Sequence, residues 1–72
     1  MTYSHRYIKG FREADRWEVE RIVHDYGFNV FSSPEISGEL EVSIAYDPTF
    51  SAKCNILEKA LQEKVHSNIQ IV

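Results

Sequence analysis

The spacing of apolar residues predicts an amphipathic helix in the stretch EADRWEVERIVHDYG, which runs from Glu13 to Gly27. Its apolar residues recur at i, i+3, i+4 and i+7, the spacing that places side chains on one face of a helix. These residues are Val19, Ile22, Val23 and Tyr26. Gly27 is expected to end the helix because glycine tolerates a positive φ angle.

A second helix is predicted after the segment DPT, with Thr49 or Ser51 as its cap and its end near His66. One face of it should be apolar and therefore buried. That face consists of Phe50, Cys54, Leu57, Leu61 and Val65.

Four strands are predicted around these helices. The segment ELEVSIAYD alternates apolar and polar residues with the period of two that is typical of a half-buried strand. The segments YSHRYIK, FNVFSS and NIQIV are rich in aromatic and β-branched residues, which favour strands. The resulting order, βαββαβ, predicts one ferredoxin-like α+β domain over residues 1–72, with a four-stranded antiparallel sheet and both helices on one face.

Trp17 does not fit the first helix as a core residue. At about 100° per residue it lies about 160° from Val19, on the face that should meet water. Either the helix bends or a loop such as SSPEISG folds over the side chain, or the side chain belongs to a binding surface. In the second case, the partner-binding residues are Trp17, Arg21, His24, Glu13 and Glu20.

Composition argues against two classes of partner. Eight Lys and Arg residues against eleven Asp and Glu residues give a net charge of −3, and neither sign forms a block. A nucleic-acid or membrane-surface binder usually shows a basic face, so we expect neither partner. A single cysteine and an N-terminus without the apolar run of a signal peptide predict a cytoplasmic chain.

No catalytic or metal site is predicted. Cys54 lies on the apolar stripe of the second helix, so we interpret it as a core residue and not as a nucleophile. His5, His24 and His66 fall on separate elements, and no pair has the i, i+4 spacing of helical metal ligands. We therefore expect no enzyme activity, no cofactor and no metal.

Segments of the sequence resemble families of the same topology, but the functional residues of those families are missing. VSIAYDPTFSAKCNILEKALQE resembles the second half of heavy-metal-associated domains, but GFRE replaces their CxxC ligands. GFNVFSSPEISGELEV resembles a segment of acylphosphatases. Of their phosphate loop only Gly10, Phe11 and Arg12 remain, and Ser32 or Ser33 replaces the catalytic Asn. RNA-recognition motifs need aromatic residues where the third strand here would expose Glu41, Ser43 and Ala45.

The sequence thus favours a small non-enzymatic module that binds or inhibits a partner protein through the outer face of the first helix. In size and lack of motifs it resembles accessory proteins of phages and mobile elements, including anti-defence inhibitors. Two alternatives remain open: a homo-oligomer that packs through the open face of the sheet, and a nucleic-acid or nucleotide binder on the first strand. The residues of this sheet face are His5, Tyr7, Lys9 and Phe31.

Overall fold

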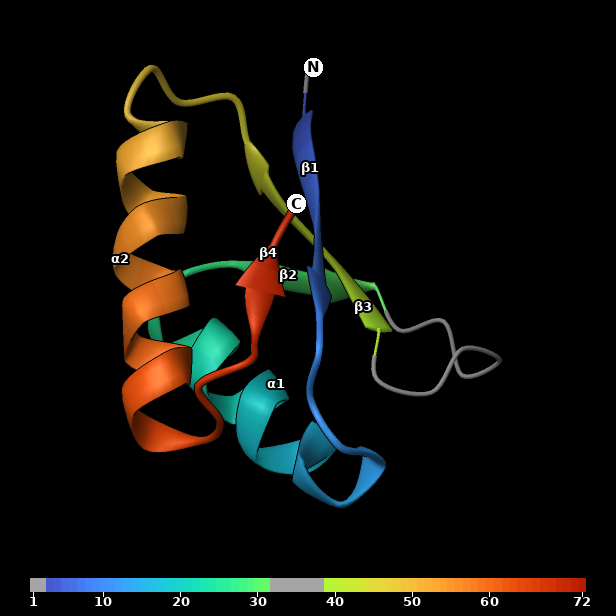
Figure 1. The fold of residues 1–72 in the computed structure, drawn as a ribbon. Helices are drawn as coiled ribbons and strands as arrows, with labels where there is room; N and C mark the ends of the chain where they lie inside the picture. Colours follow the sequence, from blue (N-terminus) through green and yellow to red (C-terminus); the bar gives the residue numbers. More distant parts are fainter. Residues whose placement is uncertain (1–2, 32–38) are drawn as a thin grey trace.

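The predicted order of elements is confirmed by the structure, a computed structural model that describes residues 3–31 and 39–72. Figure 1 shows the elements in chain order. They are β1 (Tyr3–Lys9), the 3-10 turn η1 (Glu13–Asp15), α1 (Arg16–Asp25), β2 (Asn29–Phe31), β3 (Glu39–Ala45), α2 (Phe50–Lys64) and β4 (Gln70–Ile71). The end of the predicted second strand, Ser32 and Ser33, and the segment around Pro34 lie outside the described residues.

The four strands form one antiparallel sheet in the order β2-β3-β1-β4. β1 pairs along its whole length with β3, and near its end with β4, where Ile8 lies opposite Ile71. Two backbone hydrogen bonds between Tyr7 and Val72, of 2.9 and 2.8 Å, extend this second pairing. This strand order, with a helix in each connection that crosses the sheet, is the predicted ferredoxin-like α+β arrangement.

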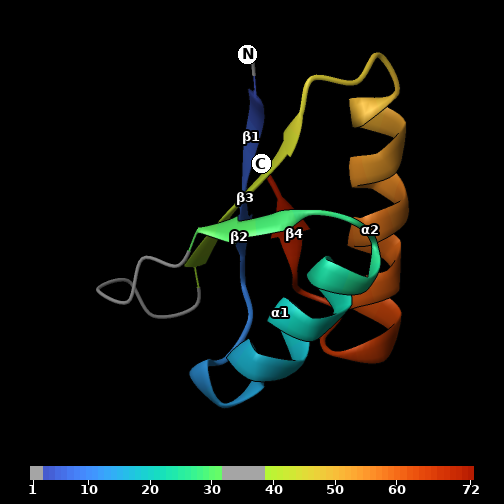
Figure 2. The ribbon, with the colours of Figure 1, turned by 180° about the vertical axis from the view of Figure 1, so that it is seen from behind.

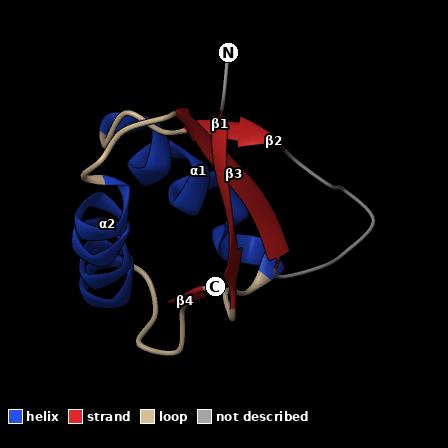
Figure 3. Cartoon of the chain, turned by 90° about the horizontal axis from the view of Figure 1, so that it is seen from above, coloured by secondary structure: helices blue, strands red, loops and turns tan. Residues whose placement is uncertain are grey.

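Both helices pack on the same face of the sheet. In Figures 1 and 2, α2 stands beside the strands and α1 lies next to the lower half of α2, and Figure 3 shows α2 on one side of β1 and β3. Side chains from both helices and from the inward face of the sheet join in one core. It contains Ile8, Phe11, Val19, Ile22, Val23, Phe28, Leu40, Val42, Cys54, Leu57, Ala60, Leu61 and Ile69.

Side chains of α2 also hold the short strand β4 in place. The amide of Gln62 donates to the backbone carbonyl of Ile69 at 2.9 Å, and the carboxylate of Glu58 accepts from the backbone N–H of Ile71 at 2.8 Å. These bonds satisfy backbone groups that so short a strand cannot pair by itself. They explain how the last few residues of the chain complete the sheet.

The end of α1 at glycine is also confirmed. Gly27 has a φ of +86°, and its N–H donates to the carbonyl of His24 at 2.9 Å. The N–H of Phe28 donates to the carbonyl of Val23 at 3.2 Å. Together the two bonds form a Schellman motif, which satisfies carbonyls that the end of a helix leaves unpaired.

The expected core position of Tyr26 is wrong. Tyr26 follows the last residue of α1 with φ −91° and ψ 7°, and its side chain is 37% exposed. Because the backbone has left the helical conformation there, the i+7 position no longer lies on the buried stripe. Phe28, beyond the turn at Gly27, is buried in the core instead.

The start of α2 differs from a simple side-chain cap. Thr49 is the N-cap residue, as one of the two predictions had it, but its hydroxyl makes no bond to the helix. The Thr49 hydroxyl and N–H both donate to the Asp47 carboxylate at 2.7 Å, and the Lys53 ammonium donates to it at 2.6 Å. These bonds lower the pKa of Asp47, the one to Lys53 most strongly.

Candidate functional site

The outer face of α1 carries a shallow groove beside an exposed tryptophan. Trp17 is 77% exposed, more than any other large apolar side chain among the described residues. The groove measures about 290 Å³. Its lining comes from one face of the helix and consists of Trp17, Glu20, Arg21, His24 and Asp25.

The exposure of Trp17 bears on the two interpretations of its position. Val19, Ile22 and Val23 are buried on the opposite side of α1, as their spacing predicts. The loop that was considered as a cover for Trp17, residues 32–38, lies outside the described residues. The high exposure of the indole is therefore the observation that favours a binding surface.

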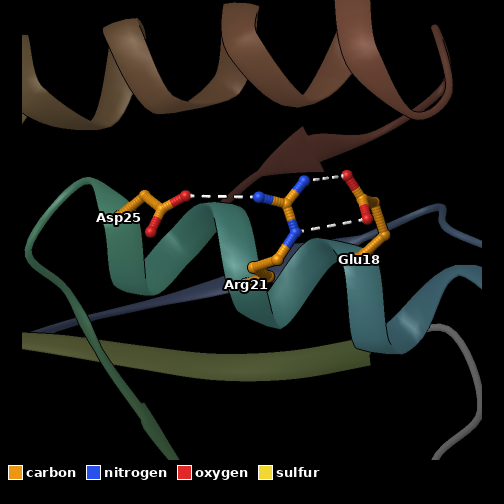
Figure 4. A network of polar contacts seen from close by, with 3 residues as sticks. All are labelled: Glu18, Arg21 and Asp25. Atoms are coloured by element: carbon orange, nitrogen blue, oxygen red, sulfur yellow. Dashed lines mark hydrogen bonds and ion pairs between the residues drawn. The ribbon is translucent and has the colours of Figure 1, made fainter.

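Arg21 is held by two carboxylates of its own helix (Figure 4). Its guanidinium donates to both oxygens of Glu18, through Nε at 3.4 Å and through Nη2, and to Asp25 through Nη1 at 3.5 Å. The hydrogen bond to Glu18 is the main reason why the pKa of Arg21 is raised above its usual value. The Arg21 guanidinium thus already donates hydrogen bonds to two carboxylates on this surface.

The other predicted residues of this surface separate into two groups. Glu20 and His24 line the groove together with Trp17, because positions 17, 20 and 24 share one helical face. Glu13 does not line the groove. It lies one turn earlier, in η1, where its carboxylate accepts a 2.8 Å hydrogen bond from Arg16.

Sequence reasoning missed Glu18 and Asp25, which shape the charge of this surface. Both have the spacing of helical ion pairs with Arg21, Glu18 at i−3 and Asp25 at i+4. That spacing was the signal that could have identified them. Asp25 also lies two turns beyond Trp17, on the same face as the groove.

The open face of the sheet holds the alternative site. His5, Tyr7 and Lys9 are all exposed on β1, as the alternation of that strand requires. The ring of His5 lies 2.9 Å from the carboxylate of Glu41 on β3. Phe31 pairs with Glu41 through the backbone of β2.

Ser43 shows that this outer face of the sheet is not uniformly exposed to solvent. It alternates on β3 with the core residue Val42 and the partly buried Ile44, yet its side chain is fully buried, and its Oγ has no hydrogen-bond partner among the described residues. Its partners in the neighbouring strands are His5 and Asn29. The register thus places a larger residue beside Ser43 on each neighbouring strand, an environment that the alternation of β3 alone does not reveal.

Cys54 lies in the core, as predicted. It is 7% exposed on α2, and burial raises the pKa of its thiol. Because the thiolate is the reactive form of cysteine, this environment suppresses nucleophilic chemistry.

We expect the Cys54→Ala variant to fold and to lose about 1 kcal/mol of unfolding free energy or a little more, the cost of a small truncation in the core. A soluble thiol reagent should label native Cys54 slowly and urea-unfolded Cys54 fast. Urea denaturation and the labelling rate measure the two effects. Rapid labelling of the folded chain would contradict the buried position.

Neither a metal-binding cluster nor a membrane-spanning helix is found in the described part of the chain. Residues 3–31 and 39–72 contain no group of three or more His, Cys, Asp or Glu side chains that could hold a metal ion. Neither helix within those ranges has the length and apolar character needed to cross a bilayer. Comparisons of the chain with protein-family models, curated proteins and solved structures found no match.

Proposed function

We propose that this chain is a non-enzymatic module that binds a partner protein through the outer face of α1. The observation that carries the proposal is the exposure of Trp17 beside a groove. Tryptophan is enriched among the residues that dominate binding energy at interfaces, where it contributes a large apolar area. An inhibitor that blocks its target through such a surface is one form of this function.

Packing supports the same surface. The opposite side of α1 supplies Val19, Ile22 and Val23 to the core, so the fold does not require Trp17. A large apolar side chain that contributes little to folding is a candidate for a role in binding. The rim of charged residues around it matches the polar rim of protein interfaces.

We expect Trp17→Ala to change the unfolding free energy by less than about 1 kcal/mol, against about 3–5 kcal/mol for a buried tryptophan. The same variant should weaken the partner complex by about 2 kcal/mol or more. Native tryptophan fluorescence should be red-shifted and quenched by acrylamide. A blue-shifted, protected emission would contradict the exposed position and remove the main support for the proposal.

Tyr46→Ala is the matched control for binding. Tyr46 is 62% exposed and lies after β3, away from the groove on α1. A protein captured from host extract should be retained by wild type and by Tyr46→Ala, and lost by Trp17→Ala. A partner that both variants retain equally would show that α1 is not the binding surface.

The second candidate function is self-association through the open face of the sheet. Exposed Tyr3 and Tyr7 on β1 favour it, since aromatic side chains are common at interfaces. The polar His5–Glu41 pair disfavours it, because stacking two sheets would remove the Glu41 carboxylate from water. Light scattering on the purified chain separates a monomer from a dimer, and Tyr7→Arg should dissociate a dimer of this kind.

The charges of β1 make nucleic acid a poorer partner. His5 lies against Glu41, and the backbone register of β1 and β3 places Lys9 opposite Glu39. Each of these two basic residues thus has a glutamate of β3 as a neighbour. Those carboxylates would repel phosphate, which must be neutralised when nucleic acid binds.

A further inference from the structure

We infer that the groove on α1 receives a lysine or arginine side chain from a basic segment of the partner. The inference rests on the proposed function and adds the chemistry of the partner to it. It follows from the charge of the groove, from the free face of Trp17 and from the size of the groove.

The charge around the groove is negative although it contains an arginine. Glu18 and Asp25 both accept hydrogen bonds from the Arg21 guanidinium, so its positive charge is already balanced by two carboxylates of the same helix. Glu20 lines the same groove and makes no ion pair within the described residues. With His24 taken as neutral, the lining residues Glu20, Asp25 and Arg21 give a formal charge of −2 + 1 = −1, and Glu18 beside Arg21 brings it to −2. This charge complements a cationic partner.

Trp17 adds a second attraction for a cation. In the described part of the chain, the cation–π contacts are those of Arg6 on Phe50 and Arg16 on Phe11, and Trp17 makes none. Tryptophan is the aromatic side chain that attracts cations best. An ammonium or guanidinium group placed over its ring would be within the field of the Glu20 carboxylate as well.

The size of the groove limits what can enter it. At about 290 Å³ it lies at the lower end of the roughly 300–1,000 Å³ found for pockets that enclose whole small molecules. It is also open, being lined by one helix alone. It therefore accommodates one long side chain, while the rest of the partner segment lies along the surface of α1.

The test is to select binders to the full chain from a displayed library of random peptides, without counter-selection, and to measure the Kd of the selected peptides for wild type and for Trp17→Ala. We expect the selected peptides to be enriched in Lys and Arg. Their Kd should rise about thirtyfold in Trp17→Ala. It should rise about three- to fivefold in Glu20→Gln, as for a partly exposed charge pair, and binding should weaken as salt is added.

Glu63→Gln is the matched control, because Glu63 is exposed on α2 and the change removes the same charge away from the groove. Its Kd should stay within about twofold of wild type, as for a distant screened charge. If Glu63→Gln and Glu20→Gln weaken peptide binding equally, the attraction comes from the net charge of the chain and not from the groove. That result would overturn the inference.

The selection also separates this inference from the proposed function. Neutral or acidic peptides whose binding depends on Trp17 would overturn the basic partner and leave the binding surface on α1 in place. Peptides that bind wild type and Trp17→Ala equally, or no selected peptides at all, would overturn both.

Discussion

Replacing Val19 with aspartate is expected to unfold the chain. Val19 lies fully buried in the core between α1 and the sheet. A carboxylate there would have no partner, and the effective cost of burying an unpaired ion is several kcal/mol. A domain of this size has only about 0.05–0.15 kcal/mol of stability per residue, so such a loss removes most or all of it. Far-ultraviolet circular dichroism and urea denaturation measure the outcome.

Ile56→Asp is the control for this prediction. Ile56 is exposed on α2, so the aspartate introduced there carries the same charge but stays in water. The loss of helix propensity is similar in the two variants. We expect the unfolding free energy of this variant to lie within about 1 kcal/mol of the wild-type value. A Val19→Asp variant with the same urea midpoint as Ile56→Asp would contradict the position of Val19 in the core.

Gly10→Ala is expected to destabilise the chain by about 3 kcal/mol. Gly10 follows β1 with a φ of +91°, a conformation that costs an alanine about 1–2 kcal/mol. A Cβ at this position would also lie 2.4 Å from the carbonyl oxygen of Asn68, in the backbone before β4. Backbone cannot rotate away as a side chain can, so overpacking adds about 1–3 kcal/mol.

Gly27→Ala is the control that separates the cost of the φ angle from the cost of the close contact at Gly10. Gly27 has nearly the same φ, +86°, but in the described part of the chain no atom beyond its own chain neighbours lies within 4 Å of a Cβ built there. We expect it to lose only the conformational part, about 1–2 kcal/mol. Urea denaturation of both variants gives the difference, and equal losses would show that the approach of Gly10 to Asn68 is not tight.

Local patterns in the sequence were sufficient to predict the helices and strands of this fold. The spacing of Val19, Ile22 and Val23 identified the buried face of α1, and Gly27 identified its end. The alternation in β3 identified Leu40 and Val42 as core residues. These features repeat with the period of a single helix or strand, so neighbours in sequence determine them. The ferredoxin-like order then followed from the succession of elements.

The candidate site was predictable only in part. The position of Trp17 on the outer face of α1 followed from helical geometry. The capture of Arg21 by Glu18 and Asp25 was not deduced, although its i−3 and i+4 spacing was present in the sequence. That capture changes the character of the surface, because it turns an apparent Trp–Arg site into an acidic one.

Other features were decided by the tertiary structure. Gly10 needs to be small because the backbone at Asn68, far along the chain, passes against it. Ser43 is buried on the outer face of the sheet because its neighbours on β1 and β2 flank it. Tyr26 leaves the core because the helix ends one residue before it. Periodicity reports which face of its own element a residue occupies, whereas the neighbours on that face come from distant parts of the chain, and only folding brings them together.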